Sequence, residues 1–286
     1  MTNDLLLQME ERMLSFSKGQ RRIAGYIMDH YEKAAYMTAA KLGETVNVSE
    51  STVVRFATEL GFEGYPEFQR AMQGIIRTRL TAFQRIEVTN QLIGDGNVVE
   101  KILAADADKI KRTAEEIDCI AFDRAVEALL SARTIYIMGV RSSSNLAGFL
   151  DSGMRRMFDN VKMIQSTAGS EVFEQMINIG PEDVLVAISF PRYSKRVVTA
   201  VEFAHHVGAN VISLTDSHHS PIAPLADQLL TAHTDMASFV DSLVAPLSII
   251  NALIVALSRK KQNDLTERLH RLEQIWDEYE VYEKSK

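Results

Sequence analysis

Two short segments in the second half of the chain carry residues that could bind an anion. They read IMGVRSSS over residues 137–144 and SFPRYS over residues 189–194, and each follows a predicted buried strand. Serine hydroxyls and backbone N–H groups at the start of a helix bind phosphate or carboxylate. One such loop alone is typical of a capping serine, but two at strand ends of one sheet favour an anion site. The candidates are Gly139, Arg141, Ser142, Ser143, Ser189, Arg192, Tyr193, Ser194 and, from a third turn over residues 166–171, Glu171.

The arginines make these two loops unusual, because each loop carries one. A guanidinium pairs with a carboxylate or a phosphate through two parallel hydrogen bonds. We hypothesise that Arg141 and Arg192 converge on an anionic ligand that is more acidic than a simple phosphosugar, or that lacks the phosphate. The alternative, in which both side chains point to solvent, remains open.

A second set of polar residues, near the N-terminus, has the chemistry of DNA contacts. A predicted helix runs from an N-cap at Ser49 to Leu60, where Gly61 ends it. Hydroxyl groups on its N-terminal half can bond bases or phosphates, arginine can read guanine, and basic residues of an earlier helix can contact the DNA backbone. The predicted contacts are Lys18, Arg21, Arg22, Ser49, Glu50, Ser51, Thr52 and Arg55.

The elements that must position these contacts are two short helices. A first helix over residues 38–46 and a turn at 46–48 precede the helix that starts after Ser49. Spacing alone leaves open a plain helical hairpin with solvated polar residues. The apolar positions expected to face the core are Ala39, Ala40, Leu42, Val53, Val54, Phe56 and Leu60.

This region resembles the N-terminal domain of the RpiR/MurR family of bacterial transcriptional regulators. The resemblance rests on VSESTVVRF at residues 48–56, followed by LGF at 60–62, GYP at 64–66 and Phe68, and it covers roughly residues 5–80. It implies a winged-helix-like or helix-turn-helix DNA-binding domain. It also implies that Ser49, Ser51, Thr52 and Arg55 contact DNA.

From about residue 120, β-rich runs alternate with helical stretches. Strands are predicted over residues 134–139, 161–164, 184–189, 210–214 and 228–231, with helices over 143–158, 171–179 and 194–207 between them. Continuous apolar strands in such alternation indicate a parallel sheet covered by helices on both faces, with ligands bound beyond the carboxyl ends of the strands. The predicted fold class is therefore an all-helical N-terminal domain followed by a doubly wound parallel α/β domain.

Residues 105–260 resemble the SIS domain, a sugar-isomerase fold that binds phosphosugars and is the usual partner of this DNA-binding domain. The family's loops commonly read G-x-G-x-S and S-x-S-G-x-T. Here they read Gly-Val-Arg-Ser-Ser from Gly139 and Ser-Phe-Pro-Arg-Tyr-Ser from Ser189, so Pro191 and Arg192 replace the middle serine and glycine. Loss of that glycine removes a place where backbone can approach a phosphate closely, which puts phosphosugar binding in doubt.

The chain divides into a DNA-binding domain over residues 1–80, a helical linker over 81–105, and a ligand-binding and oligomerisation domain over 106–286. Residues 88–97 are rich in glycine, asparagine and aspartate and are the best linker candidate. Residues 264–282 form a predicted helix with a coiled-coil-like apolar seam. Packing on its own domain and a dimer contact are both open for that helix.

Composition excludes several classes of protein. The chain has 286 residues, 46% of them hydrophobic and 24% charged, which is ordinary for a globular protein. Its single cysteine, Cys119, cannot form an internal disulfide, and adjacent histidines at 205–206 and 218–219 lack the pattern of a metal site. The longest apolar stretch, 243–257, is too short to span a membrane, and no signal peptide is visible. We expect a cytoplasmic protein without metal or cofactor.

Taken together, these features predict a ligand-responsive transcriptional regulator that is not an enzyme. Its expected partners are operator DNA, a small anionic carbohydrate-type effector and further copies of itself, as a homodimer or homotetramer. The alternative is a phosphosugar isomerase with an accessory domain, in which Glu171, Glu174 or His233 would be acid or base. A third possibility is a SIS-like domain that has lost its ligand and serves assembly alone.

Overall fold

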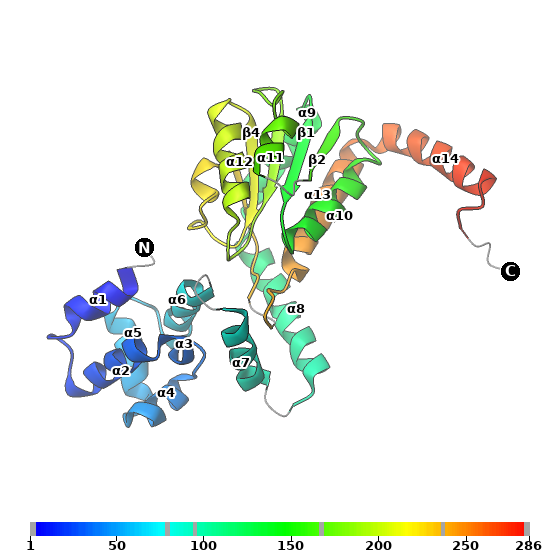
Figure 1. Ribbon diagram of the computed structural model, residues 1–286. Helices are drawn as coiled ribbons and strands as arrows, with labels where there is room; N and C mark the ends of the chain where they lie inside the picture. The colour runs from blue at the N-terminus through cyan, green and yellow to red at the C-terminus, as the bar shows by residue number, and fades with distance from the viewer. Residues whose placement is uncertain (1–3, 78–80, 94–95, 166–168, 236–237, 283–286) are drawn as a thin grey trace. The chain divides into compact units, whose positions relative to one another are not determined.

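The computed structural model describes residues 4–77, 81–93, 96–165, 169–235 and 238–282 (Figure 1). The chain forms two compact units. The first comprises Met1–Ile102 with the short segment Met236–Asp241, and the second comprises Leu103–Asp235 with Ser242–Lys286.

The first unit is helical. Its elements are α1 Asp4–Arg12, α2 Lys18–Asp29, α3 Tyr31–Ala34, α4 Ala39–Val46, α5 Glu50–Glu59, α6 Tyr65–Arg77, α7 Ala82–Ile93 and the start of α8 Val98–Glu116. Aromatic rings from several of these elements form its centre. Phe56 packs edge to face against Phe16 and Phe68, with ring centroids 5.2 and 5.8 Å apart. All three side chains are buried, so their packing joins α5 to α6 and to the segment before α2.

The turn between α4 and α5 has the features of a helix-turn-helix. Asn47, after the last residue of α4, adopts a left-handed conformation with φ of 56°. The Ser49 hydroxyl caps α5 by accepting a hydrogen bond from the Thr52 N–H. A Cβ at Gly43 would lie 2.9 Å from the Val48 carbonyl oxygen, so only glycine lets the turn fold back onto α4.

Some sequence expectations in this unit were wrong in detail. Ala40 and Val54, expected in the core, are exposed, because burial follows Ala39, Leu42 and Gly43 on α4 and Val53, Phe56 and Ala57 on α5. The predicted break at residues 88–97 overlaps α7, which continues to Ile93. Local glycine and asparagine content therefore did not mark the start of irregular structure.

The second unit is built on a parallel sheet of five strands. These are β1 Ile135–Gly139, β2 Val161–Ile164, β3 Val184–Ile188, β4 Asn210–Thr215 and β5 Gln228–Thr231, in the order β2-β1-β3-β4-β5. Each neighbouring pair is parallel. The switch in strand order lies between β1 and β3, where doubly wound sheets bind ligands beyond the carboxyl ends.

Helices cover both faces of this sheet and enclose two apolar clusters. α9 Cys119–Ser131, α10 Ser143–Met154 and α13 Val244–Lys260 pack on one face. α11 Gly169–Gln175, α12 Lys195–His206 and the short helix η1 Ala223–Leu225 pack on the other. The predicted doubly wound fold is confirmed. Helix α14, Gln262–Glu278, extends from the end of α13 and has no fully buried residue (Figure 1). None of the helices in the described ranges is long and apolar enough to cross a membrane.

A buried carboxylate holds together the amino-terminal ends of β1 and β3. Asp183 accepts hydrogen bonds from the Arg133 guanidinium and from the Gly180 N–H at 2.8 Å. Burial acts to raise the pKa of Asp183, but Arg133 and the Gly180 N–H outweigh it and hold that pKa below its usual value. The carboxylate therefore stabilises the folded state above its unfolded pKa, and this contribution is lost as the pH falls toward the depressed folded pKa.

We predict that Asp183→Asn makes the stability of the protein depend less on pH in the acid range. The variant should unfold at lower temperature at neutral pH and differ less from the parent at pH 3. The check is thermal unfolding followed by circular dichroism between pH 3 and pH 7. A stability difference between variant and parent that stays constant over this range would contradict the role given to Asp183.

Candidate nucleic-acid interface and ligand-binding loops

The exposed face of α5 and the beginning of α2 form one polar surface in the first unit. A Cβ on Gly19 of α2 would meet Thr52 at 3.4 Å and Val48 at 3.5 Å, so the two helices start close together. The Arg22 guanidinium reaches the Asn47 carbonyl oxygen at 3.4 Å, across the turn that precedes α5. The small residue at position 19 thereby brings the basic residues of α2 beside the N-terminus of α5.

The predicted DNA contacts differ in exposure. Thr52 is half-buried, and its hydroxyl lies 2.8 Å from that of Ser49, which caps α5 and also lies 2.9 Å from the Ser51 hydroxyl. The other contacts are exposed: Lys18, Arg21, Arg22, Ser49, Glu50, Ser51 and Arg55. Thr58 is also exposed one turn after Arg55, and its hydroxyl donates to the Arg55 carbonyl oxygen at 2.9 Å.

This surface has the chemistry for major-groove recognition. A short helix presents exposed hydroxyl and guanidinium groups near its N-terminus, where partial positive charge attracts phosphate. Glu50 can only accept a hydrogen bond, so it suits a cytosine amino group rather than a phosphate. The basic side chains of α2 suit the phosphate backbone.

The predicted ligand loops in the second unit follow β1 and β3, which are neighbours in the sheet. A Cβ on Gly139 would lie 2.5 Å from the Ser143 carbonyl oxygen, so glycine is required for α10 to begin directly after β1. Ser143 and Ser189 are buried. Ser142 and Ser194 stand at the N-caps of α10 and α12, yet neither hydroxyl makes a capping hydrogen bond. The serines therefore do not serve as ordinary helix caps.

Both loop arginines have left-handed backbones. Arg141 has φ of 57° and Arg192 has φ of 67°, a region that non-glycine residues seldom adopt. They occupy the places that glycine holds in the two loop patterns of the resembling family. Both arginines thus adopt the backbone region that glycine enters without strain. Both side chains are exposed, and the strands that precede them are neighbours in the sheet.

The other predicted ligand residues surround these loops. The Tyr193 hydroxyl donates to Asp216, which follows β4, at 2.7 Å. Glu171 is half-buried on α11, while the turn before it, residues 166–168, lies outside the described residues. Within the described part of the chain, no histidine, cysteine and acidic side chains group in threes to hold a metal. His233, a candidate acid or base, instead hydrogen-bonds to Arg112 and Glu116 of α8.

A helix-turn-helix unit joined to a parallel α/β unit with loops suited to an anion defines a class of ligand-binding transcriptional regulators. Comparison with known proteins agrees. Residues 3–78 match the helix-turn-helix domain of the rpiR family, and residues 128–256 match the SIS domain. The chain belongs to the RpiR family of transcriptional regulators.

Similar proteins share this organisation over nearly their whole length. The HTH-type transcriptional regulator HexR of Pseudomonas aeruginosa is 25% identical, covering 95% of this chain and 95% of HexR. An HTH-type regulator of Caldanaerobacter subterraneus is 26% identical, covering 95% of this chain and 96% of its own. The structure of Vibrio vulnificus NanR complexed with ManNAc-6P has a TM-score of 0.59 and 22% identity, covering 96% of this chain and 98% of NanR. The relatives are regulators, and they favour the regulator over the isomerase alternative.

Proposed function

We propose that this regulator binds operator DNA as a homo-oligomer in the cytoplasm and responds to a small, anionic carbohydrate. Exposed α5 residues would read bases in the major groove, and Lys18, Arg21 and Arg22 would contact phosphates. A two-fold symmetric oligomer predicts an inverted-repeat operator with half-sites about one helical turn apart, or a multiple of it.

The observation that carries the effector class is the pair of left-handed arginines at adjacent strand ends. Arg141 and Arg192 place two guanidinium groups where the fold presents N–H groups and hydroxyls of helix starts. Two guanidinium groups match a ligand with two negative charges, or with a carboxylate and a phosphate, better than a neutral sugar. The ManNAc-6P in the NanR structure supports a sugar derivative as ligand of this fold.

The mechanism we propose is a coupling free energy between effector and DNA. The DNA-binding units of the oligomer would have two arrangements, of which one binds the operator better. An effector that binds one arrangement more tightly changes operator affinity, by no more than the ratio of its own affinities for the two arrangements. Such coupling is reciprocal, so operator DNA must change effector affinity by the same factor.

A calorimetric titration of the full-length protein tests the effector class. The panel consists of hexoses, their 6-phosphates, the corresponding aldonic acids and the aldonic acid 6-phosphates, so that charge varies on a constant carbon skeleton. We expect no binding by neutral sugars at Arg141 and Arg192, and tighter binding as negative charge increases. Affinity that is independent of charge, or absent throughout, would contradict the proposed effector class.

A further inference from the structure

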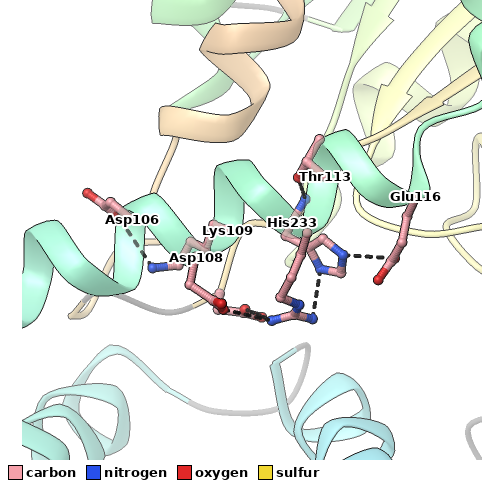
Figure 2. A network of polar contacts seen from close by, with 8 residues as sticks. Asp106, Asp108, Lys109, Thr113, Glu116 and His233 are labelled. Carbon is pink, nitrogen blue, oxygen red and sulfur yellow. Dashed lines mark hydrogen bonds and ion pairs between the residues drawn. The ribbon is translucent and has the colours of Figure 1, made fainter.

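A polar network around His233 fastens the last turns of α8 to the carboxyl end of β5 (Figure 2). The backbone N–H of His233 donates a hydrogen bond to the Thr113 hydroxyl at 3.0 Å. The ring Nδ1 lies 3.1 Å from the Arg112 guanidinium, and Nε2 lies 2.9 Å from the Glu116 carboxylate. A guanidinium can only donate, so Nδ1 accepts and Nε2 carries the proton that is donated to Glu116. These partners fix the orientation of the imidazole and select one tautomer.

The preceding turns of α8 add further bonds to the same network. Arg112 also pairs with Asp235, 3.2 Å away and just beyond His233. Six residues before Arg112, Asp106 accepts hydrogen bonds from the Ser242 hydroxyl at 2.7 Å and from Lys109 at 3.2 Å. The basic side chains on this face of α8 are thus already engaged with acidic partners (Figure 2).

A cavity of about 300 Å³ lies beside this network at the carboxyl ends of β4 and β5. Its walls come from the end of α8, from the turn after β4 and from the end of β5: Thr113, Glu116, Asp216, Ser217, His218, His219, Thr231, Ala232 and His233. None of these residues belongs to the loops after β1 and β3. The cavity therefore has a different lining from the site assigned to the anionic effector, and its size is at the lower end of small-molecule sites.

The lining decides the class of ligand. It contains carboxylates, imidazoles and hydroxyls but no lysine or arginine, so an anion would face Glu116 and Asp216 without a compensating cation. A metal ion lacks a coordinating set here, because among the described residues no three histidine, cysteine or acidic side chains group to hold one. A polyhydroxylated molecule suits this mixture, because its hydroxyls donate to carboxylates and accept from imidazole N–H groups.

We propose that this cavity is a second ligand site, which takes a small uncharged sugar or sugar alcohol. The ligand would contact α8 through Thr113 and Glu116 and the sheet through the residues after β4 and β5. Ligand binding would therefore stabilise the packing of α8 against the end of β5. The chain that precedes α8 belongs to the DNA-binding unit. The Tyr193–Asp216 hydrogen bond connects the wall of this cavity to the Arg192 loop.

The experiment is a titration of the full-length protein with neutral aldohexoses, hexitols and pentitols. Binding is followed by NMR of ¹⁵N-labelled histidine side chains, and the His233 signals are assigned with His233→Gln. We expect a neutral member of the panel to shift the His233 and His218 resonances. No shift by any neutral member, or equal shifts by hexose 6-phosphates, would overturn the proposal.

Two matched variants test the wall formed by α8. Glu116→Gln keeps an acceptor for the His233 N–H but removes the charge that faces the cavity, and should weaken binding about tenfold, as expected for one hydrogen bond to a charged group. Glu115→Gln, an exposed neighbour outside the lining, should leave affinity unchanged. Equal affinities of both variants and the parent would overturn the proposal, and Ser217→Ala replaces Glu116→Gln if the latter fails to fold.

The same titration separates this proposal from the proposed effector site. Arg192→Gly should remove binding of anionic sugars and leave the neutral ligand's histidine shifts unchanged. If Arg192→Gly removes both the binding of anionic sugars and the histidine shifts caused by the neutral ligand, the protein has a single ligand site. The proposal of a second site is then overturned. If anionic sugars never bind while a neutral sugar does, the effector class fails and this cavity stands.

Discussion

Replacing Arg141 and Arg192 together by glycine is expected to make the protein more stable and unable to respond to its anionic effector. Each arginine has a left-handed backbone, which costs a non-glycine residue about 1–2 kcal/mol. Glycine removes that strain but loses about 0.5–1 kcal/mol to the greater entropy of its unfolded chain. The net expectation is a gain of about 0.5–1 kcal/mol in the free energy of unfolding for each site.

The loss in effector affinity is expected to be much larger. A hydrogen bond to a charged group contributes about 1.5–3 kcal/mol, so removing two guanidinium groups should weaken binding by a factor of about one hundred or more. Differential scanning calorimetry gives the stability and isothermal titration gives the affinity. Arg141→Lys with Arg192→Lys is the matched control, because lysine keeps the charge and the backbone strain but not the planar pair of donors. A glycine variant that is less stable, or that binds the effector normally, would contradict this account of the loops.

The second large effect is expected at the DNA surface. Arg55→Ala should weaken binding to the specific operator by about 1–3 kcal/mol and relax the preference for one base pair, as loss of a bidentate contact to guanine does. Arg21→Ala should instead weaken binding to all DNA sequences. It should also lower the slope of log affinity against log salt concentration by about one, because one phosphate contact is lost. Arg70→Ala is the control, since Arg70 is an exposed arginine of α6 that lies outside the predicted surface.

Fluorescence anisotropy with the operator and with base-substituted operators, each at several salt concentrations, measures these effects. The contrast between the two arginines is the informative result. If Arg55→Ala and Arg21→Ala have the same effect on every sequence, Arg55 contacts only the backbone and α5 does not read bases through it.

The strands were predictable because parallel strands are buried on both faces. β2 and β5 have the predicted bounds, and the other three differ by one residue at one end. The helix ends were less predictable. The expected helix over 143–158 ends at Met154, yet Met157 and Phe158 continue into the core, so the apolar pattern outlasts the helix. The same occurs after α11, where Met176 and Ile179 are buried in a turn. Apolar spacing reports burial, and burial continues where the backbone has already turned.

The ligand loops were located from sequence, but their backbone conformation was not. A positive φ at arginine could not be read from the sequence, because local preference disfavours it for residues other than glycine. The surrounding strands and helices impose that φ nevertheless. The network around His233 could not be predicted either, since its partners are more than a hundred residues apart and carry no motif. Contacts of this kind depend on the strand order, which the sequence pattern leaves undetermined.

The most direct test of the central claim measures operator binding with and without the effector. Labelled DNA from upstream of the protein's own and neighbouring genes is titrated by fluorescence anisotropy at several salt concentrations, with each member of the charged-sugar panel. The account predicts tight, salt-dependent binding to one fragment, and a change in that affinity with an anionic sugar that is lost when Arg141 and Arg192 are glycine. Absence of selective binding to any fragment by folded protein, or operator binding that no anionic sugar alters, would contradict it.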